Sequence, residues 1–361
     1  MSSANLFMEI LDRSNASDVL FAHATPATMY RIGRTCWMAR RAVQDYSRRA
    51  FNINKHLRRF FNDPIGFRSL QAQTGTLMTG VFAHGFLDRT LWDETRLDLY
   101  VYPQHAVDVG RWVMENGGKG YQFKPMVDQH CDFDVAVAAW LKWPDPWDWE
   151  SGDDWDVQMR GMQNFLKFLA DEEGSGLTVR MMVAEHAPLI TLIAYHWHST
   201  AFMNVITFYA AYSLHPFTTF EEKERNNIRS AALLTIDLEI GYDLIDTPNA
   251  LKQRLTKPFV FGDRWVDDES SWVLPLGTRG VSWPKLSEKT PPLSFDPFSV
   301  NAWDLVPSSS GMPQIGHWEI AREIFKFRYC STASFYMYMK DTIDTLGELE
   351  RTERSNHRDW S

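Results

Sequence analysis

An arginine and an aspartate stand two residues apart in the segment "RLDLYV", as Arg96 and Asp98. The segment predicts a β-strand, on which side chains two residues apart lie on the same face. Two carboxylates at this spacing, with a third from a neighbouring strand, can hold paired divalent ions that orient a triphosphate and activate a hydroxyl. Arg96 takes the place of the first carboxylate and removes most of the attraction for such ions. Asp98 is therefore either a metal ligand that has lost its partner or an ordinary strand acid paired with Arg96 or Arg89.

A glycine turn and an acidic turn precede this strand. Gly80 lies in "TLMTGVF", where a glycine lets the backbone approach a phosphate closely. Asp93 and Glu94 lie just before the strand and are the acids that could replace the missing one. Catalytic use of this region would therefore rest on Asp98 together with Asp93 and Glu94.

A second group of residues that could do chemistry is the pair His196 and His198 in "YHWHST". On a strand the two rings would share a face and could bind a metal, whereas on a helix they would point in different directions. The surrounding apolar pattern favours a helix, with both histidines buried and hydrogen-bonded. The segment "DQHCDFD" at residues 128–134 would complete a metal site if it met this pair.

Composition limits the classes of protein to consider. Of 361 residues, 44% are apolar and 23% charged, which is typical of a folded chain with a large core. The three cysteines form no CxxC pair, so we expect no disulfide framework and a reducing compartment. The N-terminus lacks the pattern of a signal peptide, so we expect an intracellular, cytoplasmic or nuclear protein without a membrane span. Motifs of serine hydrolases, P-loop and Rossmann proteins and zincins are missing from the sequence.

Periodicity predicts an α+β chain. We expect three short helices in residues 15–62, helices in 64–74, 81–92, 105–117, 157–174, 318–330 and 341–359, a buried helix pair or helix-turn in the uncharged run 187–220, and a helix after Thr218. We expect strands at 96–102, 121–126 and 177–185, and long loops with short strands in 257–316. Residues 141–156 hold four tryptophans among six acids and are predicted to be an inserted loop.

Three segments, in residues 34–54, 63–101 and 198–223, are similar to a large fungal family with a nucleotidyltransferase-like domain preceded by an F-box-like helical segment. The similarity is closest over residues 17–125 and 175–225. In this family the glycine turn usually reads Ser-Gly-Ser and the strand Ser-Asp-Leu-Asp-Leu-Tyr-Val. Gly80 matches the turn glycine, Arg96 stands at the first acid and Asp98 at the second. The third acid would come from the strand at residues 177–185, whose centre holds no carboxylate.

The resemblance implies roles for particular residues. The resemblance assigns nucleotide binding to Thr79, Gly80, Arg89 and Arg96. It assigns metal binding to Asp98, with Mg²⁺ or Mn²⁺ as the cofactor if the chain transfers nucleotides. It also implies an F-box-like segment at residues 1–62, a nucleotidyltransferase-like domain at 63–225 with the insertion at 141–156, and a helical and loop-rich region at 226–361.

The helical segment is strongly basic. Between residues 31 and 59 nine Lys and Arg face one Asp, in a chain whose net charge is −9. An F-box-like segment implies an apolar docking face for a ubiquitin-ligase adaptor, and six residues could supply it: Val19, Leu20, Phe21, Met29, Tyr30 and Ile32. The alternative, which we favour, is that these residues cap the core while the arginines pair with acids of the main domain. Those arginines are Arg34, Arg40, Arg41, Arg48 and Arg49. The acidic balance does not favour a nucleic-acid partner.

We therefore predict a non-catalytic, nucleotidyltransferase-like binding or adaptor protein. The first alternative is an active metal-dependent nucleotidyltransferase that uses Asp93 or Glu94 as substitute acids. The second is a metal-dependent enzyme built on His196 and His198.

Overall fold

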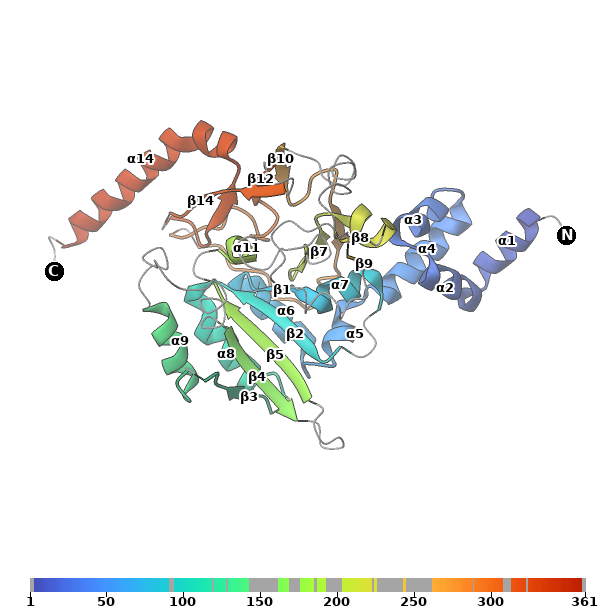
Figure 1. Cartoon of the computed structure of the whole chain (residues 1–361), viewed down its shortest axis with the longest axis horizontal. Helices are drawn as coiled ribbons and strands as arrows, with labels where there is room; N and C mark the ends of the chain where they lie inside the picture. Colours follow the sequence, from blue (N-terminus) through green and yellow to red (C-terminus); the bar gives the residue numbers. More distant parts are fainter. Residues whose placement is uncertain are drawn as a thin grey trace.

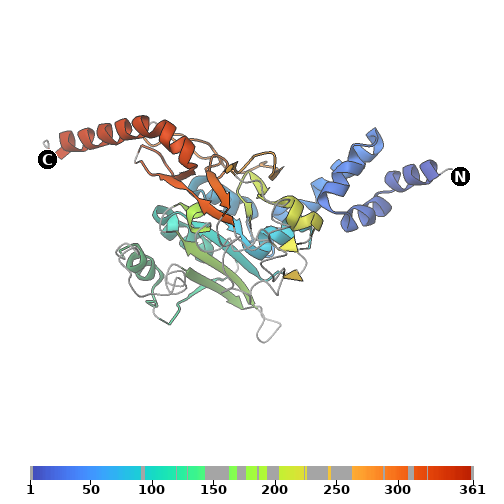
Figure 2. The ribbon, with the colours of Figure 1, turned by 45° about the horizontal axis from the view of Figure 1, so that its top comes forward.

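The computed structural model describes residues 3–90, 94–118, 120–127, 129–142, 162–168, 176–184, 187–192, 203–222, 224–225, 243–244, 262–287, 289–307, 313–322 and 324–358. The chain is an α+β protein built on a mixed eight-stranded sheet with helices around it (Figure 1). The N-terminal helices project from one side of this body and the C-terminal helix from the opposite side (Figures 1 and 2).

The main sheet runs in the order β11-β7-β6-β1-β2-β5-β4-β3. Neighbouring strands are antiparallel except β2 and β5, which are parallel. The strands are β1 (Leu77–Thr79), β2 (Arg96–Val101), β3 (Gln122–Lys124), β4 (Met162–Phe168), β5 (Gly176–Val183), β6 (Asn204–Ile206), β7 (Ala210–Ser213) and β11 (Trp272–Pro275). A parallel pair needs a long crossover, and the chain between β2 and β5 includes two helices, α8 (Ala106–Glu115) and α9 (Phe133–Leu141).

Both faces of this sheet are buried. Leu97 and Leu99 point into a core shared with α8, α9 and two further helices, α6 (Pro64–Thr74) and α7 (Gly80–Asp88). Tyr100 and Met182 point the other way, into a second core shared with the C-terminal region. β2 and β5 therefore lie at the centre of the molecule, between two layers.

The C-terminal region covers the second face with short strands. They are β10 (Gly262–Trp265), β12 (Ala302–Pro307), β13 (Pro313–Gly316), β14 (Trp318–Ile320) and β15 (Tyr329–Ser331). One further small pair is β8 (Glu224–Arg225) with β9 (Asp243–Leu244). A short helix, α11 (Pro188–Thr191), and the final helix, α14 (Ala333–Arg358), complete the region. The expected loops with short strands in 257–316 are confirmed where the structure describes them.

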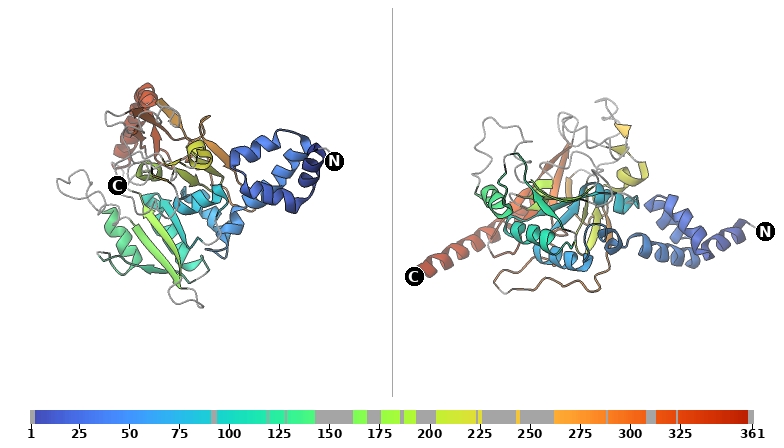
Figure 3. Two further views of the ribbon diagram at one scale, coloured as in Figure 1. Left: turned by 45° about the vertical axis from the view of Figure 1, so that its right-hand side comes forward. Right: turned by 90° about the horizontal axis from the view of Figure 1, so that it is seen from below.

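Five helices form the N-terminal segment, and Figure 3 shows the blue N-terminal helices as a group beside the main body. They are α1 (Ser3–Asp12), α2 (Ser14–His23), α3 (Pro26–Gly33), α4 (Trp37–Ala50) and α5 (Ile53–Leu57). Side-chain caps define several starts: Thr25 accepts a hydrogen bond from the Thr28 N–H, and Asn52 accepts one from the Lys55 N–H. The helices expected in residues 15–62 are confirmed as α2 to α5, one more than the three short helices expected, and α1 precedes them.

Two predicted helices are wrong. Residues 162–168 form the strand β4, in which Gln163 and Phe165 are fully buried while Asn164 is half-buried. Burial therefore alternates from one residue to the next, as in a strand, and does not follow a helical period. The strand is favoured because β3 and β5 pair with β4 on both sides through backbone hydrogen bonds. Residues 318–331 form the antiparallel pair β14 and β15 instead of a helix. In the run 187–220 the structure describes the short helix α11 and then β6 and β7, so strands replace the expected helix from Asn204 on, while residues 193–202 lie outside the described residues.

The helix expected after Thr218 is only partly described. Phe217–Glu222 forms a π-helical turn and Glu224–Arg225 a short strand, β8. The tryptophan-rich insertion at 141–156 lies outside the described residues beyond Lys142.

Candidate functional site

Asp98 lies in the middle of β2, where Thr79 of β1 and Arg180 of β5 stand beside it in the sheet. The Arg180 guanidinium donates two hydrogen bonds to the Asp98 carboxylate, from Nε to Oδ1 at 2.6 Å and from Nη2 to Oδ2 at 2.8 Å. The Arg96 Nε lies 3.6 Å from Oδ2. Asp98 is only 9% exposed, whereas the Arg180 side chain is 31% exposed, so this is a partly buried bidentate ion pair, a geometry typical of strong polar contacts.

The glycine turn lies directly against this carboxylate. Gly80 is the first residue of α7 and has a φ of 69°, a conformation that favours glycine. A Cβ atom there would lie 2.6 Å from Asp98 Oδ2. The Thr79 hydroxyl donates to the Asn204 carbonyl at 2.9 Å, which ties the turn to β6. The turn therefore accommodates the Asp98 carboxylate itself.

The other predicted site residues do not all join this cluster. Glu94 Oε1 accepts the backbone N–H of Arg96 at 2.7 Å, so Glu94 is used at the start of β2. Asp93, His196 and His198 lie outside the described residues. Within the part that is described, no three His, Cys, Asp or Glu residues gather as metal ligands.

The segment at 128–134 mainly starts a helix. Asp132 caps α9 by accepting the Val135 N–H at 3.0 Å, and the His130 Nδ1 accepts the Asp132 N–H at 3.0 Å. His130 and Cys131 are exposed. Asp128 lies outside the described residues.

Sequence reasoning missed Arg180, although it recognised that the strand 177–185 has no carboxylate at its centre. The signal was present as a lone charge inside the apolar run "LTVRMMV". A buried strand carries a charged residue only when a partner on the same face compensates it. Its partner was not predictable, because the register between β2 and β5 is set by the fold.

Arg89 binds backbone carbonyls at the junction between the N-terminal helices and the main body. Its φ is 64°, and its guanidinium donates to the Phe21 carbonyl and to the Ala24 carbonyl, both at 2.7 Å. These carbonyls lie at the C-terminal end of α2, where helix geometry leaves acceptors unpaired and a cation is favourable. Glu221 complements it by accepting the Thr25 hydroxyl at 2.7 Å and the Ala27 N–H at 3.0 Å, at the start of α3.

We expect Arg89→Gly to loosen the N-terminal helices without unfolding the sheet. Glycine keeps the positive φ but loses two charge-assisted hydrogen bonds, a loss of about 2 kcal/mol in the docking of the helices. Hydrogen exchange of α2 and α3 should accelerate by roughly 30-fold, while β2 and β5 keep their protection. Arg279→Gly, at an exposed arginine of the C-terminal region, is the control. Unchanged exchange in α2 and α3 would contradict this role for Arg89.

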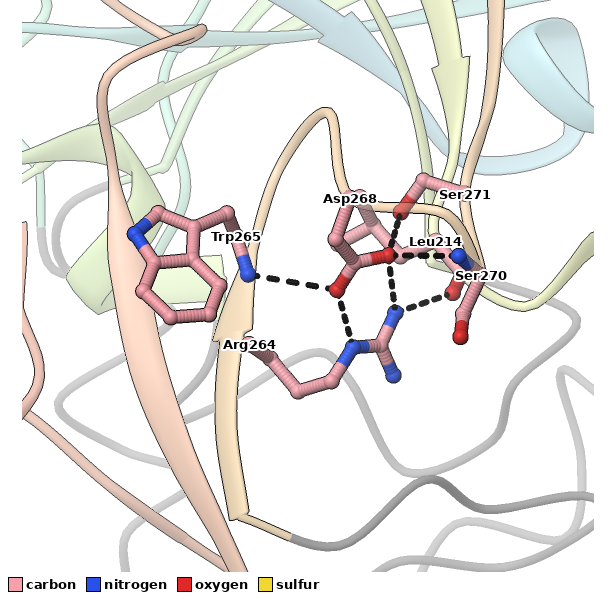
Figure 4. Close-up of polar contacts among 6 residues, drawn as sticks. All are labelled: Leu214, Arg264, Trp265, Asp268, Ser270 and Ser271. Carbon is pink, nitrogen blue, oxygen red and sulfur yellow. Dashed lines mark hydrogen bonds and ion pairs between the residues drawn. The ribbon is translucent and has the colours of Figure 1, made fainter.

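A second buried ion pair joins β7 to the chain between β10 and β11 (Figure 4). Arg264 donates to both carboxylate oxygens of Asp268 and to the Leu214 carbonyl, the last at 2.9 Å. Asp268 also accepts from Trp265 N, Ser270 N and the Ser271 hydroxyl. Burial alone would raise the pKa of Asp268, but the hydrogen bond and the charge of Arg264 outweigh it and lower that pKa.

His215 is buried beside this ion pair. Burial, and next the charge of Arg264, lower the pKa of His215 to about 3. The imidazole is therefore neutral in the folded protein at ordinary pH. This fits a structural role, because a histidine that exchanges protons with a substrate needs a pKa near the working pH.

No protein-family model, curated protein or solved structure matches the chain. Among the residues that the structure describes, no helix combines the length and the apolar character needed to cross a membrane. What is shown is the class: an α+β protein with a mixed sheet, on whose central strands an aspartate is held by an arginine.

Proposed function

We propose that this chain is a nucleotidyltransferase-like protein that has no transfer chemistry and acts by binding other molecules, as an adaptor does. The observation that carries the proposal is the bidentate pair of Asp98 with Arg180. The resemblance assigns the first acid to Arg96, the second to Asp98 and the third to the strand that is now β5. Arg180 of β5 stands in register with Asp98. Two of the three acid positions then hold guanidinium groups.

This charge arrangement opposes a divalent ion. Mg²⁺ needs oxygen ligands in a near-octahedral shell, usually with carboxylates among them. Both oxygens of Asp98 already accept hydrogen bonds from Arg180, so an ion would have to displace that guanidinium from a largely buried site. Arg96 at 3.6 Å adds further repulsion. The cluster is better suited to stabilising the junction of β1, β2 and β5 than to activating a nucleophile.

The substitute acid that the structure describes, Glu94, does not restore the ligand set. Glu94 is occupied by the backbone of Arg96, and its carboxylate is not part of a three-ligand group among the described residues. The active-enzyme alternative therefore serves as the outcome that would overturn the proposal.

The test is an assay of transfer with the full chain. Each radiolabelled nucleoside triphosphate is incubated with Mg²⁺ or Mn²⁺ and with protein, RNA and nucleotide acceptors, and we expect no labelled product. Metal-dependent labelling that is lost in both Asp98→Ala and Glu94→Gln would refute the proposal. Metal-dependent labelling that survives both substitutions but co-purifies with the chain would also refute the proposal, since Asp93, His196 or His198 would then carry the chemistry.

A further inference from the structure

The exposed face of α4 carries an unusual set of side chains. Trp37, Arg40, Arg41, Gln44 and Arg48 are all exposed, and we call them the α4 basic face. Their spacing places them along one side of the helix. Ala39, Val43 and Tyr46 on the other side are buried against the neighbouring helices.

The positive charge of this region is mostly not neutralised. All nine Lys and Arg between residues 31 and 59 are exposed. Arg48 pairs with Asp45 and Arg49 with Asp18, both inside the helical segment. The other seven form no ion pair within the described part of the chain. We expected Arg34, Arg40, Arg41, Arg48 and Arg49 to pair with acids of the main domain. Within the described part of the chain this expectation is wrong.

The predicted apolar docking face is also interrupted. Phe21 and Met29 are completely buried, whereas Val19 is 62% exposed. Tyr30 packs edge-on against Trp272, with ring centroids 6.2 Å apart. The most exposed large aromatic of this segment is instead Trp37, at 72%, and the Arg41 guanidinium lies 5.7 Å from its ring centroid.

We infer that the α4 basic face binds an acidic protein segment that carries one apolar side chain beside its carboxylates. Arginines bind carboxylates bidentately and Trp37 offers a flat apolar surface between them. The α4 helix is about 20 Å long, which matches a short peptide segment. This inference deepens the proposed binding function and names its partner by chemistry.

Charge balance favours an acidic protein segment over a nucleic acid. The chain carries −9 overall while residues 31–59 carry +8, so the rest carries −17. A long polyanion would extend beyond the face and be repelled by that acidic remainder. A single strand of nucleic acid also needs several stacking platforms for tight binding, whereas this face exposes one indole.

The test measures fluorescence anisotropy of a labelled 14-residue peptide of alternating Glu and Asp with one central Leu, which is long enough to span α4 when extended. The full chain should bind it with an affinity that falls as salt increases. Arg40→Gln/Arg41→Gln/Arg48→Gln should weaken binding about tenfold or more, because three charge pairs are lost. Trp37→Ala should weaken it by a smaller factor that salt does not change.

Matched controls decide whether the face is specific. Arg279→Gln/Lys285→Gln/Lys289→Gln removes the same charge from exposed positions of the C-terminal region and should leave binding unchanged. A peptide with Gln and Asn in place of Glu and Asp should not bind. The inference fails if both triple variants weaken binding equally or if the acidic peptide does not bind. It also fails if labelled oligo(dT) of the same length binds more tightly, since the partner would then be a nucleic acid. None of these results depends on the transfer assay.

Discussion

The double variant Arg96→Asp/Arg180→Asp is expected to bind Mn²⁺, which the natural chain is not. The two substitutions replace a cluster of one carboxylate and two guanidiniums by three carboxylates on the neighbouring strands β2 and β5. Oxygen ligands at this spacing suit a divalent ion, and the local charge changes from positive to strongly negative. Mn²⁺ at ten times its dissociation constant should stabilise the variant by about 1.4 kcal/mol.

Two further variants separate metal binding from a general change in charge. Arg96→Gln/Arg180→Gln removes the guanidiniums without adding carboxylates and should bind no Mn²⁺. Adding Asp98→Asn to the double aspartate variant should weaken its binding by about tenfold or more, because a central ligand loses its charge. Isothermal calorimetry and Mn²⁺ electron paramagnetic resonance both report on binding. Equal affinity in the glutamine and aspartate variants would show that the ion binds elsewhere and would remove the main support for a degenerate metal site.

Acidification is expected to destabilise the folded protein through His215. The pKa of His215 is about 3 in the folded chain, lowered by burial and then by Arg264, against about 6.5 when unfolded. Between these values the unfolded chain takes up a proton that the folded chain does not, so stability falls as the pH decreases. The loss is about 1.4 kcal/mol per pH unit, or about 2.7 kcal/mol between pH 6.5 and 4.5.

The measurement compares urea unfolding of the natural chain and of His215→Gln at several pH values from about 7 to about 4.5. Other titrating groups are common to both proteins, so the difference in slope isolates this side chain. His215→Gln should be less stable at neutral pH and should lose less stability on acidification. His130→Gln, at an exposed histidine, is the control. A His215→Gln protein with the natural pH dependence would show that His215 is not buried as described.

The local sequence was enough to predict the elements whose apolar spacing is unambiguous. The strand holding Asp98, the strand at 177–185 and the helix after Pro103 all form as expected. Asp63 and Pro64 start α6 because the carboxylate caps the Gly66 N–H at 2.8 Å and proline suits the first turn. In these places local propensity, capping and pattern agree.

The failures share one cause. The segments that became β6 and β7 lie in an uncharged, mostly apolar run, which fits a buried helix as well as a buried strand. Those that became β4, β14 and β15 mix apolar with polar and charged residues at a spacing that also fits an amphipathic helix. Whether Phe165 lies in a helix or a strand depends on β3 and β5 offering hydrogen bonds on either side. β3 lies well before β4 in the chain and β5 follows β4. A short stretch of sequence around Phe165 therefore does not contain both pairing strands.

For the site, the sequence by itself determined that an arginine, and not a second carboxylate, stands two residues from Asp98 on the same face of the strand. It also determined that residues 31–59 are strongly basic. Only the tertiary structure decided that Arg180 binds Asp98, because the parallel register of β2 and β5 brings them together across the chain. Only the tertiary structure decided that the arginines of α4 remain exposed, because the apolar side of that helix is the side that packs.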